Sequence, residues 1–234
     1  MKKLLVFVLS IIFIMGTVVA IPTAAIKVPR AKIKIDGKVK DWKKIKKYKI
    51  TKGTLGQKLD YKWWCQLAHN KKDTIYLRAQ VTYPKGMGGP YASRPKNSPT
   101  WYEDDVIEFW VMEKKPTSER SFQEATRNTH YGWNSKVNFH AEAAGGLKVT
   151  RATKTRWIKS KDGTFGIEAA IKVKTAKMKR AIKNGRSLYL TVGYESRSGG
   201  AEYSLLKNGG GAGALFWVNY DAVQKATFSK KLVK

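Results

Sequence analysis

Apolar and polar residues alternate along most of the chain that follows the first twenty residues. Alternation of this kind is typical of half-buried β-strands, because successive side chains point to opposite faces of a sheet. Strands are therefore expected over residues 61–68, 74–82, 105–112, 136–141, 147–153, 165–173, 188–195 and 226–233. Within them, Lys172 and Lys174 alternate with Ile171 and Val173, which puts these lysines on the solvent-facing side.

A helical pattern is expected over residues 175–184 alone. Thr175 is suited to cap its first turn, and Asn184 followed by Gly185 is a typical C-terminal stop. Many short strands joined by long loops, with so little helix, predict an all-β fold: an antiparallel β-sandwich with one short helix.

The chain divides into a short leader and one domain. Lys2 and Lys3 precede an apolar run over residues 4–19, and small residues end that run at Ala20. This order predicts a signal peptide over residues 1–20, cut after Ala20; a retained anchor is the alternative, although the run is near the lower limit for a spanning helix. No linker divides the rest, so residues 30–234 are expected to form one domain.

The predicted leader also decides the compartment. The protein is expected to be secreted and extracellular, or associated with the cell surface, with no membrane span after cleavage because no second apolar run of that length occurs. The single cysteine, Cys65, cannot form an intramolecular disulfide, and its apolar neighbours favour a buried structural thiol over a nucleophile.

Net charge is the extreme feature of the composition. The chain has 46 Lys plus Arg against 17 Asp plus Glu, a formal charge of +29, and loss of Lys2 and Lys3 with the leader lowers it to +27. Only ten of the cations are arginine, whose planar fork reads phosphates and bases, so specific recognition of nucleic acid is disfavoured. Residues 27–52 carry twelve of these cations. They form either a solvated strand face or a surface for an anionic cell-wall polymer or acidic polysaccharide.

Six segments, in order, resemble family 9 carbohydrate-binding modules and the wider DOMON-like group. Residues 33–42 (IKIDGKVKDW) resemble the opening I-D-G-x-x-D-x-x-W, and residues 101–111 (WYEDDVIEFWV) resemble W-x-x-D-S-V-E-I-F-I-D. Residues 163–171 (GTFGIEAAI) are similar to G-Y-x-V-E-A-A-I. The other three segments are residues 61–82, residues 136–138 and the stretch from Trp217 to Leu232. The resemblance covers nearly the whole mature chain and implies a non-catalytic sugar binder.

The resemblance also implies a site. In the family, two tryptophans sandwich a sugar ring while a carboxylate, a basic side chain and an amide bind its hydroxyls. The matching residues are the platforms Trp101 and Trp217, the carboxylate Glu108, the base Lys136 and the amide Asn138. Trp133, in residues 129–134, is expected as a further exposed aromatic that extends the site, with packing of that loop as the alternative.

Other chemistries remain open as weaker interpretations. The acidic residues 103–105 with Glu108 would suit a glycosidase, but strand alternation turns Asp105 and Glu108 to opposite faces. Structural calcium is implied by the family, and Asp36 and Asp41 are carboxylates in its opening motif, yet no ligand set is assigned. Haem is the third alternative, with Met112 or His140 as axial ligand. Trp42, Trp64 and Trp110 are expected in the core.

Overall fold

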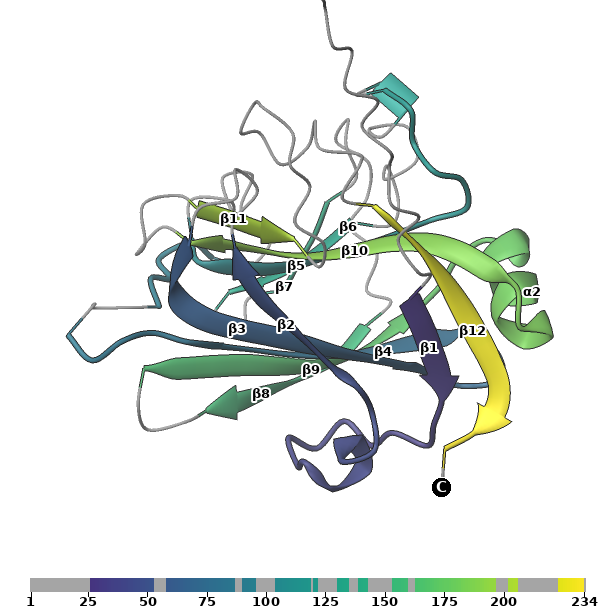
Figure 1. Cartoon of the computed structure of the whole chain (residues 1–234), viewed down its shortest axis with the longest axis horizontal. Helices are drawn as coiled ribbons and strands as arrows, with labels where there is room; N and C mark the ends of the chain where they lie inside the picture. The colour runs from purple at the N-terminus through teal and green to yellow at the C-terminus, as the bar shows by residue number, and fades with distance from the viewer. Residues whose placement is uncertain are drawn as a thin grey trace, which may run out of the picture.

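The computed structural model describes residues 26–52, 58–86, 90–95, 104–118, 120–121, 130–134, 139–142, 153–159, 163–196, 202–205 and 223–233 (Figure 1). The predicted leader, residues 1–20, lies outside these ranges. None of the helices in the described ranges is long and apolar enough to cross a membrane.

Strands dominate the described chain. They are β1 (Ile26–Arg30), β2 (Lys47–Lys52), β3 (Lys58–His69), β4 (Thr74–Thr82), β5 (Val106–Met112), β6 (His130–Asn134), β7 (Phe139–Glu142), β8 (Thr153–Lys159), β9 (Thr164–Lys172), β10 (Ser187–Ser196), β11 (Glu202–Leu205) and β12 (Gln224–Leu232). The helical elements are the 3-10 turn η1 (Lys40–Trp42) and α2 (Ala176–Asn184).

The strands form one curled sheet in the order β7-β6-β5-β10-β12-β1-β3-β4-β9-β8, with β11 added to β10 and β2 added to β3. Figure 1 shows two layers, one built from β5, β6, β7, β10 and β11 and the other from β2, β3, β4, β8 and β9, with β12 and β1 joining them at one side. Pairing within each layer is antiparallel, whereas β1 pairs in parallel with both β12 and β3. The predicted all-β sandwich is confirmed.

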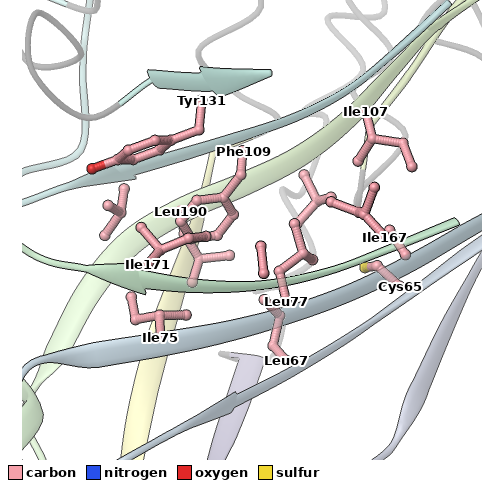
Figure 2. Close-up of a cluster of buried hydrophobic side chains, with 14 of the residues drawn as sticks. Cys65, Leu67, Ile75, Leu77, Ile107, Phe109, Tyr131, Ile167, Ile171 and Leu190 are labelled. Atoms are coloured by element: carbon pink, nitrogen blue, oxygen red, sulfur yellow. The ribbon is translucent and has the colours of Figure 1, made fainter. Parts of the chain in front are cut away.

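The core lies between the layers and follows the predicted alternation. Ile107 and Phe109 of β5 face Leu77 of β4 and Ile167 of β9, and all four side chains are fully buried in one hydrophobic cluster (Figure 2). Burial of each such side chain stabilises the fold by about 1.5–3 kcal/mol. Cys65 lies in the same cluster, so its expected burial is confirmed, and that burial raises the pKa of its thiol.

Most predicted strands lie close to their observed positions, and the errors concern short elements. The strand predicted over residues 136–141 is observed as β7, which begins at Phe139. Of the next predicted strand, 147–153, residues 147–152 lie outside the described ranges. Strands β1, β2, β6 and β11 were not predicted, and β8 was predicted only at its first residue, Thr153. β6 was missed although its neighbours β5 and β7 were expected, because its short sequence contains one glycine and two polar residues among its five positions.

The helix α2 agrees with its predicted signals. The Thr175 hydroxyl accepts a hydrogen bond of 3.0 Å from the Met178 amide, which satisfies one of the free amides of the first turn. Gly185 ends the helix in the left-handed conformation with φ 68°, where a side chain would also crowd the Phe228 carbonyl oxygen.

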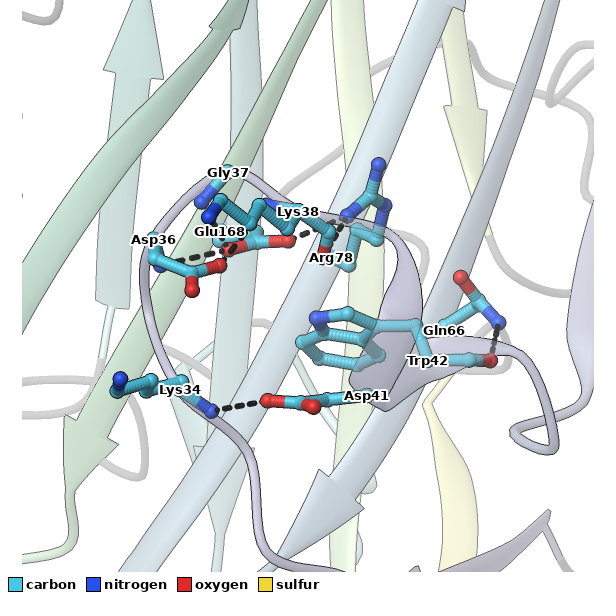
Figure 3. Close-up of polar contacts among 9 residues, drawn as sticks. All are labelled: Lys34, Asp36, Gly37, Lys38, Asp41, Trp42, Gln66, Arg78 and Glu168. Atoms are coloured by element: carbon cyan, nitrogen blue, oxygen red, sulfur yellow. Dashed lines mark hydrogen bonds and ion pairs between the residues drawn. The ribbon is translucent and has the colours of Figure 1, made fainter.

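Residues 31–45 lie against the outer face of β3, β4 and β9, and buried polar side chains hold them there (Figure 3). One Glu168 carboxylate oxygen accepts hydrogen bonds from the amides of Asp36 (3.2 Å) and Gly37 (2.8 Å), while the other pairs with Arg78. Arg78 also donates to the Lys38 carbonyl, at 3.2 Å. The opening I-D-G motif and the glutamate of the 163–171 motif are therefore two halves of one structural contact.

Candidate functional site

Two of the six predicted site residues, Glu108 and Trp133, lie in described elements. The other four, Trp101, Lys136, Asn138 and Trp217, lie outside the described residues. The site is therefore built from Glu108 and the strands around it.

Glu108 lies in the middle of β5 and points to the outer side of its layer. The inward positions of β5 are Ile107, Phe109 and Val111, which belong to the central core cluster, so alternation places Glu108 and Trp110 on the opposite face. That face is itself covered, since Glu108 is 2% exposed. A carboxylate at this depth requires polar partners or a ligand.

The strands on both sides of Glu108 place glycines next to it. In register, Glu108 lies opposite Gly132 of β6 and Gly193 of β10. Because glycine has no side chain, no neighbouring side chain on either flanking strand occupies the space directly beside the carboxylate. Its side-chain partners on these two strands therefore come from diagonal positions of the same face.

One diagonal partner is His130 of β6. Its Nε2 atom lies 3.2 Å from the Glu108 carboxylate, and its ring stacks on Trp110 with centroids 4.3 Å apart and an interplanar angle of 17°. The histidine fixes the orientation of the carboxylate and adds a second polar group to the face. Trp110 is buried as expected, but on this outer face and outside the central cluster.

The β10 side contributes Thr191 and Glu195. Thr191 lies opposite Trp110, and Glu195 lies opposite Val106, so both share the face of Glu108. Both side chains are buried, and the Thr191 hydroxyl has no hydrogen-bond partner within the described ranges. A buried hydroxyl without a partner is uncommon and marks a position where a ligand group can bond.

The expectation for Trp133 is wrong. It lies within β6 rather than in an exposed loop, and its side chain is fully buried in the central core cluster, stacked near Tyr131. Its indole nitrogen donates to the Thr155 hydroxyl at 3.1 Å. Since β6 alternates, Trp133 faces inward when His130 faces outward, so it offers no exposed platform beside Glu108.

The neighbouring aspartates have structural partners. Asp104 accepts hydrogen bonds from the amides of Ser93 (2.7 Å) and Arg94 (3.1 Å) and from the Asn134 side chain (2.6 Å). Asp105 accepts from the Tyr91 amide at 2.5 Å and from the Tyr83 hydroxyl at 3.1 Å. Both are fully buried and tie residues 91–94 to the start of β5.

Asp105 and Glu108 point to opposite faces, as the alternation predicted. The partner of Asp105, Tyr83, belongs to the central core cluster, where burial and the Asp105 charge raise the pKa of its phenol. The carboxylate that does share the outer face with Glu108 is Glu195, which the sequence interpretation did not include.

The described residues provide no ligand set for a metal ion. No group of three or more His, Cys, Asp or Glu side chains among them is arranged to hold one. Asp36 accepts from the Lys38 amide and Asp41 from the Lys34 amide, both at 2.9 Å, so both serve the turns of residues 34–41. Met112 is fully buried on β5, and His140 lies on β7 opposite Gly132.

Three features of this face were missed by the sequence interpretation: His130, Thr191 and Glu195. Thr191 and Glu195 each lie two positions from Gly193, the residue opposite Glu108. Alternation along β10 could therefore have found both once the outward face of that strand was known. His130 required recognition of β6, whose five residues carry a weak pattern.

Comparison with known proteins identifies the family. The model of the carbohydrate family 9 binding domain-like proteins matches residues 35–201. No curated protein sequence matches the chain significantly.

Solved structures share the fold. A family 9 carbohydrate-binding module from Caldicellulosiruptor kristjanssonii, solved in complex with glucose, is 15% identical with a TM-score of 0.61 and covers 88% of this chain and 96% of that chain. A structure from Bacteroides uniformis, assigned provisionally as a carbohydrate-binding protein, is 10% identical with a TM-score of 0.58 and covers 88% of this chain and 100% of that chain. Because the family model spans well over half of the sequence, this chain belongs to the carbohydrate family 9 binding domain-like proteins.

Proposed function

We propose that the protein is a secreted, non-catalytic carbohydrate-binding module that recognises a sugar on the outer face of β5, β6 and β10. Trp101 and Trp217 stack on the two faces of a sugar ring, and Glu108, Lys136 and Asn138 bind its hydroxyls. The observation that carries the proposal is the buried carboxylate of Glu108, which lies between two glycines on a face with further polar groups.

The chemistry of that face suits a sugar. Hydroxyl groups both donate and accept hydrogen bonds, and the face offers a carboxylate, an imidazole and the Thr191 hydroxyl, which has no partner among the described residues. Sugar rings also carry C–H-rich faces that pack against aromatic rings. The glucose complex of the Caldicellulosiruptor module supports a sugar as the ligand class.

Removal of either proposed platform should abolish most of the affinity. In calorimetric titrations with the glycan that binds the wild type best, Trp101→Ala and Trp217→Ala should each weaken binding by about thirtyfold or more, the effect of losing a binding hot spot of about 2 kcal/mol. The matched control is Trp64→Ala, because Trp64 is a half-buried tryptophan of β3 on the outer side of the other layer, under the Lys47 ammonium.

The control should bind as the wild type does, and thermal unfolding should show that all three variants are folded. Wild-type affinity in both Trp101→Ala and Trp217→Ala would remove the clamp from the proposal.

A glycoside hydrolase is the enzyme alternative, and Glu195 makes it testable. Glu108 and Glu195 are diagonal neighbours on one face, and glycosidases use two carboxyl groups across the scissile bond. The proposal expects that the bound oligosaccharide stays intact after long incubation. Turnover that disappears in both Glu108→Gln and Glu195→Gln would assign catalysis instead.

The second candidate function is a surface or adhesin-like protein that binds anionic polymers, with a vestigial sugar site. It is favoured by the net charge of +29 and by exposed lysines in residues 32–47, none of which forms an ion pair within the described ranges. Salt separates the two functions: stacking survives about 0.5 M salt, where the Debye length is about 4 Å, whereas electrostatic attachment fades.

A further inference from the structure

The basic segment lines two adjoining pockets on the layer opposite Glu108. One pocket, of about 510 Å³, is lined by the cations Arg30, Lys32, Lys34 and Lys71. The other, also about 510 Å³, is lined by Lys32 together with Lys40, Lys43 and Lys44. We call the two pockets together the basic groove; the volume of each pocket lies in the range of about 300–1,000 Å³ typical of ligand sites.

The groove is continuous because its pockets share lining residues. Ala31, Lys32, Asp41 and Leu232 line both of them. Asp41 is the one carboxylate in either lining, and its Oδ2 atom already accepts a hydrogen bond from the Lys34 amide. None of the lining cations forms an ion pair with a described acidic residue, so the groove carries a large uncompensated positive charge.

The backbone that carries these cations is fixed. The Ala31 amide donates to the His69 carbonyl at 3.0 Å, and the Val233 amide donates to the Arg30 carbonyl at 2.9 Å. At the other end of the segment, the buried Gln66 side chain donates to the carbonyls of Trp42 (2.9 Å) and Ile45 (2.6 Å). The lysines are therefore attached to a preorganised scaffold, which lowers the entropy cost of binding.

The floor of the groove is apolar. Ala31 and Ile45 are buried around Trp42, and the partly buried Ile33 and Val233 pack on the same cluster. A lysine rim over an aliphatic floor matches a ligand with anionic substituents and C–H-rich ring faces. Acidic polysaccharides, with carboxylate or sulfate groups on sugar rings, have both properties.

Other polyanions fit this surface less well. Single-stranded nucleic acids bind on rows of aromatic platforms, and Tyr76 is the one aromatic residue in the lining, partly buried against the Trp42 cluster. Arginine, the usual residue for bidentate phosphate contacts, is present once, as Arg30. A flat lipid surface would contact the rim of a groove and leave its floor empty.

We propose that the basic groove is a second binding site, for an acidic polysaccharide, on the opposite layer from the Glu108 face. It rests on the proposed function for the choice of a polysaccharide as the polymer, while the residues involved are separate. The module would then hold one sugar by stacking and an acidic chain by charge.

The test compares matched pairs of lysine substitutions in the full mature chain. Lys32→Gln/Lys43→Gln removes two groove cations, and Lys179→Gln/Lys183→Gln removes two exposed cations from α2, so the net charge falls equally. Binding is measured at low salt to polygalacturonate, dextran sulfate, neutral dextran and duplex DNA, with thermal unfolding as a check on folding.

We expect the groove pair to weaken binding of at least one acidic polysaccharide by about thirtyfold, because each of the two lysines near an anionic surface contributes about 1 kcal/mol. The α2 pair should change this binding less than threefold, because neither Lys179 nor Lys183 lines the groove. Selective loss with polygalacturonate would identify carboxylates as the ligand groups, and selective loss with dextran sulfate would identify sulfates.

Equal losses in the two pairs would overturn the proposal in favour of a diffuse charge effect. It would also be overturned if neither acidic polysaccharide bound the wild type, or if duplex DNA bound as tightly and depended equally on Lys32 and Lys43. Binding of neutral glycans separates the two sites. A wild type that binds no neutral glycan, but needs Lys32 and Lys43 for acidic chains, would contradict the proposed sugar clamp and leave the groove proposal intact.

Discussion

At the scale of single residues, the buried pair of Arg78 and Glu168 explains why the opening motif is attached to the sheet. Burial raises the pKa of Glu168, while the Gly37 amide, the Arg78 charge and the Asp36 amide act in the opposite direction. The charged form of Glu168 is therefore favoured by the same amides and the same arginine that the carboxylate holds in place. Loss of either member leaves the other buried without its partner.

Glu168→Ala should destabilise the fold by about 3–5 kcal/mol, the usual cost of breaking a buried ion pair. Urea unfolding measures it. The contrasting variant is Lys177→Ala, which removes a half-exposed pair with Glu113 (3.4 Å) and should cost at most about 1 kcal/mol. Equal costs for the two variants would contradict the role given to Glu168.

His69 gives the stability a pH dependence of known sign. It is 1% exposed, its Nε2 atom lies 2.9 Å from the Ser229 carbonyl, and burial lowers its pKa below the ordinary 6.5. Just below pH 6.5 the unfolded chain binds a proton that the folded protein does not. The contribution of neutral His69 to the free energy of unfolding is therefore complete above pH 6.5 and is lost as the pH falls.

The measurement is the free energy of unfolding between pH 7.5 and 5, in steps of about half a unit. His69→Gln keeps a hydrogen-bond donor but does not titrate, so its stability should fall less steeply with acid than that of the wild type. Identical slopes for the two proteins would contradict the assignment to His69.

The candidate site shows how far residue-level inference from sequence extends. Glu108 was predicted as a site carboxylate from its motif, and its direction opposite to that of Asp105 followed from their separation along the strand. The prediction of an exposed Trp133 was wrong because a tryptophan beside a glycine suggests a loop, whereas Gly132 lies within strand β6, opposite Glu108. Which face a strand residue takes depends on its pairing, and that pairing is not encoded locally.

At the scale of elements, long strands could be predicted and short ones could not. β4 and β9 carry four or more alternating apolar positions, which mark a strand without any tertiary information. β1 contains Pro29, and β2 has three lysines among six residues, so neither resembles a buried strand in isolation. Both are stabilised by their neighbours, β12 and β3.

The helix α2 supports one prediction at this scale. Thr175→Ala should cost about 1 kcal/mol of stability, because the Met178 amide loses its cap, and Thr175→Ser should restore most of it. Chemical denaturation of the three proteins is the measurement. A Thr175→Ser variant as unstable as Thr175→Ala would show that the hydroxyl is not the stabilising group.

At the scale of the whole molecule, the sandwich separates two kinds of surface. The outer side of β5, β6 and β10 carries Glu108 with its polar neighbours, and the outer side of β3, β4 and β9 carries the basic segment. Figure 1 shows these two layers on opposite sides of the core. The net charge of +29, conspicuous in the composition, is thus partly concentrated away from the proposed sugar face.

The most direct test of sugar recognition is binding of the mature wild-type protein to a glycan array at low salt and at about 0.5 M salt. We expect at least one glycan without acidic groups to be retained at both salt concentrations, because ring stacking and hydrogen bonds to hydroxyls are weakly screened. Binding only to acidic glycans, and its disappearance at high salt, would contradict a sugar site around Glu108.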